Sequence, residues 1–171
     1  MAEINIIYKI MILKLLSKVD FPLTTTQITD FFLEKEYTDY FTIQQALFDL
    51  TETQMIVINN DLNITEYSLT ENGERTLQLF AEKISPAMEK DMNLYFSMNK
   101  MQMKAENSLN AQYYSASGGG FLVHLKMSGE KNDLIDLTFS VGSEDLAKTI
   151  CVNWKCHYED VYEALFNTLV Q

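Results

Sequence analysis

The chain has 171 residues, of which 47% are hydrophobic and only two are proline, so it is too apolar for a disordered protein and long enough for one domain or two small ones. Its 24 acidic and 13 basic residues give a net charge of −11, which disfavours adhesion to nucleic acid or anionic membranes through charge alone. Two cysteines, Cys151 and Cys156, are too few for a disulfide framework and are typical of a reducing compartment.

The first apolar segment, residues 3–18, predicts an amphipathic helix. Ile4, Ile7, Met11 and Leu15 recur at helical spacing and mark its buried face. Charged residues interrupt the segment and no small-residue cleavage site follows it, which argues against a signal sequence. No segment approaches the roughly 18 uncharged apolar residues of a membrane span. We therefore expect a cytoplasmic protein without a membrane partner.

The next elements predicted are two helices, a hairpin and a further helix. Pro22 ends the first helix, because proline disfavours helical backbone in the residue before it. Threonines 24–26 offer N-caps for a second helix, and a third fits residues 42–53, with Ile43, Leu47 and Leu50 at core spacing. Residues 55–58 and 64–69 read as strands around a turn at 59–63, and a fourth helix runs from Thr70 towards residue 84.

A long fifth helix is predicted from Ser85 to about residue 107, since proline at position 86 is tolerated in a first helical turn. At 1.5 Å per residue it is roughly 30 Å long. Its apolar residues cover much of its circumference: Met88, Met92, Tyr95, Phe96, Met98, Met101 and Met103. Such a surface needs a cover, which favours a homodimer seam on this helix. The alternative is that the helix packs inside its own chain against the C-terminal sheet.

Beyond residue 110 the apolar period changes from helical to alternating. Residues 121–127 and 135–141 alternate as two strands that each bury one face, and residues 111–117 supply a third strand before the glycines at 118–120. Ser143 then caps a helix with Leu146, Ile150 and Trp154, and a last helix carries Val161, Leu165 and Leu169. The pattern predicts a small antiparallel sheet covered by one or two helices.

The predicted order of helix, helix, helix, hairpin and helix, followed by the motif Tyr67-x-Leu69-Thr70-x-x-Gly73, resembles the winged-helix regulators of the MarR and PadR type. The whole chain resembles an uncharacterised family of Firmicute proteins, the domain-of-unknown-function family numbered 4364, which implies no established activity. That wider resemblance is carried by Lys9-Ile10 through Leu16, by Tyr40-Phe41-Thr42-Ile43-Gln44-Gln45, and by the tail from Phe121-Leu122-Val123-His124-Leu125 through Ile150-Cys151-Val152-Asn153-Trp154.

Together these observations predict an α+β protein in three segments. Residues 1–84 form a winged-helix domain, residues 85–109 a long connecting and dimerisation helix, and residues 110–171 a small antiparallel sheet packed with helices. The resemblance implies a dimeric transcription regulator whose third helix contacts DNA. The side chains expected at that contact, or at a partner protein in its place, are Tyr40, Thr42, Gln44, Gln45, Asn60 and Asn63.

The local charge opposes DNA binding. Residues 36–74 hold eight acidic side chains and no lysine, arginine or histidine, although duplex affinity comes largely from cations that displace counterions from phosphate. Glutamine can still pair with adenine, and tyrosine and threonine hydroxyls can bind phosphate oxygens. The alternative is a winged-helix module that binds a basic or apolar protein surface and not DNA.

No residue pattern indicates an enzyme. Cys151-x4-Cys156-His157, with His124 elsewhere, matches no zinc module, whose cysteines usually lie two to four residues apart. The glycines at 118–120 lack the lysine and the following helix of a phosphate-binding loop, so we interpret them as a hairpin turn. We expect no catalytic residues, no metal and no cofactor.

Overall fold

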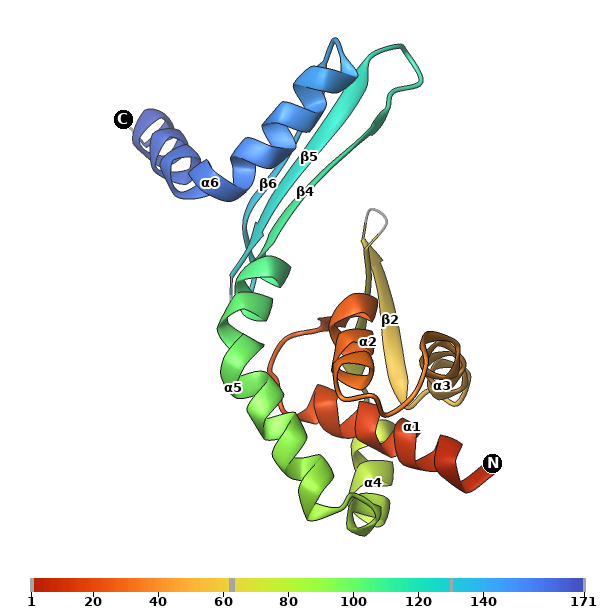
Figure 1. Ribbon diagram of the computed structural model, residues 1–171. Helices are drawn as coiled ribbons and strands as arrows, with labels where there is room; N and C mark the ends of the chain where they lie inside the picture. The colour runs from red at the N-terminus through yellow and green to blue at the C-terminus, as the bar shows by residue number, and fades with distance from the viewer. Residues whose placement is uncertain (1, 62–63, 130, 171) are drawn as a thin grey trace. The chain divides into compact units, whose positions relative to one another are not determined.

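The computed structural model describes residues 2–61, 64–129 and 131–170, and its contacts group the chain into two compact units, Met1–Lys104 and Ala105–Gln171 (Figure 1). The predicted α+β class is confirmed, with one three-stranded antiparallel sheet in each unit. The elements in chain order are α1 (Ala2–Ser17), β1 (Leu23–Thr24), α2 (Thr25–Glu34), α3 (Tyr40–Glu52), β2 (Ile56–Asp61), β3 (Ile64–Leu69), α4 (Glu71–Phe80), a 3-10 turn η1 (Ala81–Lys83), α5 (Pro86–Ser108), β4 (Leu109–Ser115), β5 (Phe121–Ser128), β6 (Asp133–Val141) and α6 (Glu144–Leu169).

Side-chain caps fix where the helices of the first unit begin. Thr24 caps α2 as predicted: its hydroxyl accepts from the Gln27 N–H at 3.2 Å, and the Gln27 side chain accepts from the Thr24 N–H at 3.0 Å. Asp39 caps α3 by accepting from the Thr42 N–H at 2.8 Å. Because of this cap, α3 starts at Tyr40, two residues before the predicted start.

The sheet of the first unit has the order β1-β3-β2. Strands β2 and β3 form the predicted hairpin, with Ile58 opposite Tyr67. Asn59 and Asn60, expected in the turn, belong to β2, because they pair with Glu66 and Thr65 across the ladder. The two residues of β1 are too few to show a periodic pattern, and the sequence analysis missed this strand.

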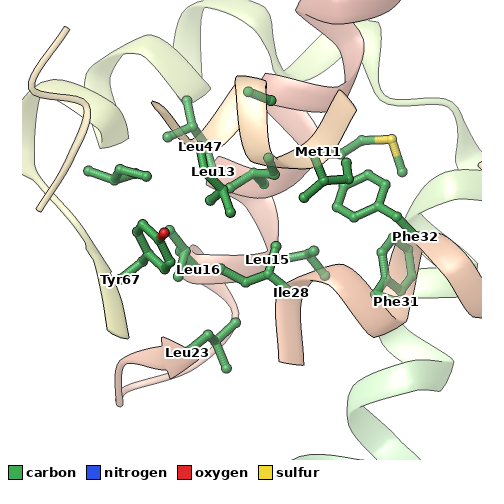
Figure 2. Packing of buried hydrophobic residues seen from close by; sticks show 14 of the residues in the cluster. Met11, Leu13, Leu15, Leu16, Leu23, Ile28, Phe31, Phe32, Leu47 and Tyr67 are labelled. Carbon is green, nitrogen blue, oxygen red and sulfur yellow. The ribbon is translucent and has the colours of Figure 1, made fainter. Parts of the chain in front are cut away.

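Helix α1 lies at the centre of the first core (Figure 2). Its buried residues are Ile10, Met11, Ile12, Leu13, Leu15 and Leu16. These positions go around the whole circumference of the helix, so the prediction of a single apolar face is wrong. The reason is that α3, α4 and β3 all contact α1.

The motif that ends in Gly73 holds the start of α4 against the start of β2. The Thr70 N–H donates to the Met55 carbonyl at 3.2 Å, and the Thr70 hydroxyl accepts from the Gly73 N–H at 3.1 Å. A Cβ atom at Gly73 would lie 2.0 Å from the Met55 carbonyl oxygen. Only glycine permits this approach between two backbones.

Helix α5 packs into its own chain for most of its length, as the alternative to a dimer seam expects, although its cover is the core of the first unit and not the C-terminal sheet. Met92, Tyr95, Phe96 and Met103 are buried in the same core as α1, and the Tyr95 hydroxyl donates to the Gln27 carbonyl at 2.8 Å. These side chains are therefore unavailable to a second copy. Of the remaining predicted seam residues, Met88 is half-buried and Met98 is exposed. The expected separate segment of residues 85–109 likewise belongs, up to Lys104, to the first unit.

The second unit is a sheet of order β4-β5-β6 with α6 packed on it (Figure 1). Its core contains Val123, Leu125 and Ile135 from the sheet and Ala147 and Trp154 from the helix. Ser143 caps α6 as predicted. The two helices expected after Ser143 are one continuous helix of 26 residues, because no proline or glycine interrupts it.

Candidate functional site: the outward face of α3

The face of α3 opposite the core carries four side chains one turn apart, Phe41, Gln45, Phe48 and Glu52, which we call the α3 stripe. All four are exposed, and the two phenylalanines are exposed to 81% and 60%. The buried face of the helix consists of Ile43, Ala46, Leu47 and Leu50. The stripe is therefore a surface of two aromatic rings and two polar groups that the first unit leaves uncovered.

The structure places only part of the predicted contact set on this face. Gln45 belongs to the α3 stripe and Tyr40 is exposed at the start of the helix. Thr42 and Gln44 are half-buried, and the amide nitrogen of Gln44 is shielded from solvent without a hydrogen-bond partner among the described residues. On the hairpin, the Asn60 side chain accepts from the Thr65 hydroxyl at 3.0 Å. Asn63 lies outside the described residues.

Phe41 and Phe48 were not predicted as contact residues, because a DNA contact on α3 was expected to use polar side chains. A signal for them was present. Phe41 and Phe48 lie seven residues apart, and both fall out of phase with the core positions Ile43, Leu47 and Leu50. Large apolar residues on the polar side of an amphipathic helix indicate a surface that binds something.

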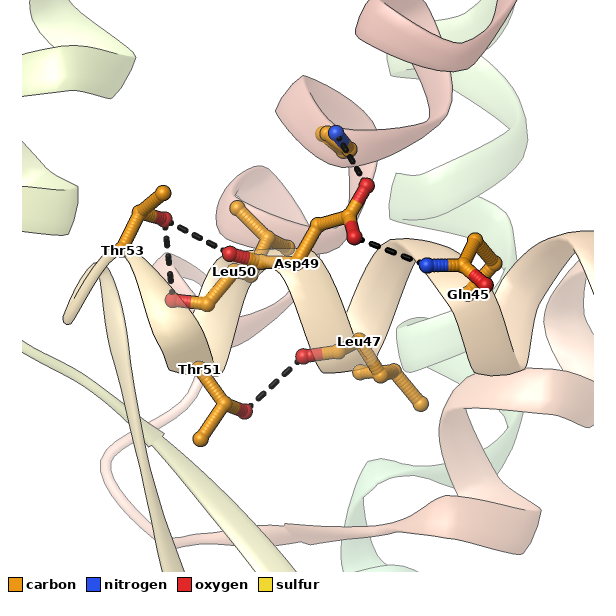
Figure 3. A network of polar contacts seen from close by, with 7 residues as sticks. Gln45, Leu47, Asp49, Leu50, Thr51 and Thr53 are labelled. Atoms are coloured by element: carbon orange, nitrogen blue, oxygen red, sulfur yellow. Dashed lines mark hydrogen bonds and ion pairs between the residues drawn. The ribbon is translucent and has the colours of Figure 1, made fainter.

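Lys9 of α1 is neutralised by a carboxylate of α3 itself (Figure 3). Lys9 Nζ lies 2.6 Å from Asp49 Oδ2, and Gln45 Nε2 donates to Asp49 Oδ1 at 2.8 Å. The hydrogen bond from Lys9, and after it the one from Gln45, lowers the pKa of Asp49. At neutral pH this network is an ion pair that leaves little positive charge for a phosphate.

Three further lysines, in α1 or directly after α1 and α2, pair with acidic residues of α5. Lys14 and Lys18 lie 3.6 and 2.6 Å from the Glu89 carboxylate. Lys35 lies 3.7 Å from Asp91, which also accepts from the Tyr37 hydroxyl at 2.7 Å. Burial, and then this hydrogen bond, raises the pKa of Tyr37 to about 12. The lysines that could form a basic flank for DNA binding by α3 are thus paired with acidic residues of α5.

A hollow of about 270 Å³ adjoins the α3 stripe on its α1 side. Phe41 and Gln45 line both the hollow and the stripe, and the Lys9–Asp49 ion pair forms its polar wall. Its remaining lining residues are Asn5, Thr42 and Ala46. The hollow can accept one side chain of a docked molecule beside the exposed ring of Phe41.

The model of one protein family, the domain of unknown function DUF4364, matches residues 8–169 of the chain. The chain belongs to this family. The match to DUF4364 covers nearly all of both units, so the family description applies to the whole chain and not to the α3 region alone. No curated protein and no solved structure gave a significant match.

The cysteines and histidines of this DUF4364 member do not come together. Cys151 is half-buried, and this burial raises its thiol pKa, whereas Cys156 is exposed. His124 pairs with Asp136 and His157 with Asp160. Over the part of the chain that the structure describes, no group of three histidine, cysteine or acidic residues is arranged to hold a metal ion. Within the same residues, no helix has the length and apolar character of a membrane span.

Proposed function

We propose that residues 1–84 form a winged-helix domain that works as a non-enzymatic protein-interaction module, with the α3 stripe as its docking surface. The order α1-β1-α2-α3, followed by the β2–β3 hairpin, supports the winged-helix assignment. In helix-turn-helix domains that bind DNA, the second helix of the pair is the recognition helix, and α3 has the corresponding place in the chain order. The observation that carries the proposal is the outward exposure of Phe41 and Phe48 on α3.

The chemistry of the stripe favours a protein partner. Covering a phenylalanine side chain contributes roughly 1.5–3 kcal/mol, and a few aromatic anchors commonly dominate the energy of a protein interface. Exposed carboxylates at both ends of α3, Asp39 and Glu52, border these rings. A matching partner surface has apolar pockets for the rings and basic residues at its rim.

A DNA-binding regulator is the second candidate, and one observation favours it. Gln45 is exposed on the α3 stripe, where a glutamine amide could pair with adenine. The hydrogen bond from Gln45 to Asp49 and the ion pair of Lys9 weigh against it, because both groups would have to leave Asp49 before they could contact DNA. We therefore rank this function second.

The first test is a crosslinking experiment on the full chain. A photo-reactive amino acid at position 48 is used to capture the partner in host cells, and the captured protein is then purified for binary binding measurements. We expect Phe41→Ser with Phe48→Ser to weaken this binding at least about a hundredfold, since each ring contributes about tenfold or more. The matched control is Leu79→Ser on α4, which removes an equally exposed side chain outside the stripe and should leave the affinity unchanged.

The second test separates the two candidate functions. The purified chain is mixed with a library of random duplexes at low and at physiological salt. If the chain is a protein-interaction module, it should bind none of the duplexes selectively at either salt concentration. Selective binding of duplexes that weakens steeply with salt, and whose sequence preference Gln44→Ala with Gln45→Ala relaxes, would instead establish the DNA-binding function.

In the first test, unchanged binding of the captured partner by the variant Phe41→Ser with Phe48→Ser would refute docking through the α3 stripe.

A further inference from the structure

Helix α6 carries a second uncovered face, at residues spaced alternately four and three apart. This spacing is that of a helix seam that packs along another helix. All seven side chains are exposed, and we call them the α6 seam: Lys148, Val152, Lys155, Glu159, Tyr162, Phe166 and Leu169. The face that packs on the sheet is a different one, with Ala147 and Trp154 buried and Tyr158, Val161 and Leu165 packed against them.

The apolar part of the α6 seam is large for a surface in contact with water. Phe166 is exposed to 56% and Leu169 to 77%, and the ring of Phe166 stacks on that of Tyr162 with 6.2 Å between centroids. Figure 1 shows the last part of α6 turning away from the sheet of its own unit. The sheet therefore does not cover these rings, and a partner must supply the cover if they are to leave water.

The charges of the α6 seam are segregated along the helix. Both lysines, Lys148 and Lys155, lie in the first half, and Glu159 lies in the second half with the aromatic residues. Glu163, adjacent to the seam, adds a further acid to the second half. Lys148 lies 3.1 Å from Glu144 one turn before it on the same helix, so Lys155 and Glu159 are the seam charges that an antiparallel arrangement of two copies brings together.

We propose that the α6 seam pairs with the α6 seam of a second copy of this chain around a two-fold axis near position 157. In this register Lys155 faces Glu159 of the second copy, Val152 faces Tyr162, and Lys148 faces Phe166. Each pair occurs twice, as an isologous interface requires.

Charge decides the direction of the pairing. A parallel pair would place Lys155 against Lys155 and Glu159 against Glu159, and like charges at such positions destabilise a helix pair. The antiparallel pair replaces both repulsions by attractions. In the same register the aliphatic stem of Lys148 can lie along the ring of Phe166 while its ammonium group keeps the ion pair with Glu144.

The inference is independent of the α3 stripe, and its test is the oligomeric state of the full chain. Light scattering after size exclusion should give a dimer at about 50 µM that dissociates on dilution. Phe166→Ser should raise the dimer dissociation constant at least about tenfold, and Lys155→Glu should do the same because it sets two acids against each other twice. Lys155→Glu combined with Glu159→Lys should restore the wild-type constant to within about threefold.

Two controls separate the pairing from misfolding and from general stickiness. Fluorescence of Trp154, which is buried in the core of the second unit, should be unchanged in every seam variant. Phe48→Ser, on the α3 stripe, should leave the dimer intact. A wild-type chain that is monomeric at about 50 µM overturns the proposal, as does a folded Phe166→Ser variant with wild-type dimerisation. Failure of the charge exchange to restore the dimer, where Lys155→Glu alone disrupts it, overturns the antiparallel register.

Discussion

At the scale of single residues, the most demanding contact is the one between Gly73 and the Met55 carbonyl. A methyl group at position 73 would lie 2.0 Å from a backbone oxygen, which cannot move aside as a flexible side chain could. We expect Gly73→Ala to lower the free energy of unfolding by about 3 kcal/mol or more, as measured by chemical denaturation. The control is Gly118→Ala, where an added Cβ meets nothing within 4 Å and the stability should change by less than about 0.5 kcal/mol.

A second residue-scale prediction concerns acid. The hydrogen bond from Lys18 is the main cause that lowers the pKa of Glu89 below its unfolded value near 4.5. A depressed folded pKa stabilises the protein above the unfolded value, and this contribution is lost as the pH falls through the folded one. Because the Glu89 side chain is 37% exposed, we expect no more than about 1 kcal/mol.

The measurement is a comparison of Glu89→Gln with the wild type at several pH values. The variant should be less stable at pH 7, and the difference should shrink as the pH falls below the unfolded pKa near 4.5 and through the lower folded pKa of Glu89. A difference that stays constant over this range would contradict the assignment, since it would come from packing and not from titration.

Single residues also show what the sequence could reveal about the site. Ile43, Leu47 and Leu50 were predicted as the buried side of α3 and are buried. The outward position of Phe41 and Phe48 follows from the same helical period, but a nucleic-acid contact was expected to use polar residues, so these two rings were not predicted. The pairing of Lys9 with Asp49 was out of reach, because it joins residues 40 positions apart through the packing of α1 on α3.

At the scale of elements, α5 is a core helix of the first unit. We expect Met92→Ala to lower the free energy of unfolding by about 2–5 kcal/mol, because it leaves a cavity among buried side chains. Met101→Ala is the matched control on the same helix, since this side chain is 89% exposed and its loss should cost less than about 0.5 kcal/mol. Equal effects of the two substitutions in chemical denaturation would show that α5 does not pack as described.

The sequence could not predict which part of the protein covers α5. An apolar pattern over much of a helix circumference shows that the helix needs a cover, and the pattern is the same whether the cover is a second copy or the same chain. Here α1 and α2 supply it, through contacts such as the one between Tyr95 and Phe31, whose ring centroids lie 5.3 Å apart. Such contacts join distant residues, and no local period encodes them.

At the scale of the whole molecule, the chain has two separate hydrophobic cores and a single tryptophan. Trp154 lies in the core of the second unit, so its fluorescence reports the unfolding of that unit, whereas far-ultraviolet circular dichroism reports both. We expect the two signals to give different denaturation midpoints, as independent cores do not obey a two-state transition. In Met92→Ala the dichroism curve should shift and the fluorescence curve should not; a shift of both by the same amount would show one cooperative unit.

The close approach at Gly73 limits what a shared sequence motif reveals about the function of a related protein. Any chain that seats a helix start on a neighbouring carbonyl at this distance needs glycine there, whatever molecule it binds. Two proteins that share the Tyr-x-Leu-Thr-x-x-Gly motif are therefore expected to share this local fold, but the motif does not indicate that they bind the same ligand. A survey that sorts related chains by the side chains at positions 41, 45, 48 and 52, which are exposed on α3, should separate chains that bind nucleic acid from chains that bind protein.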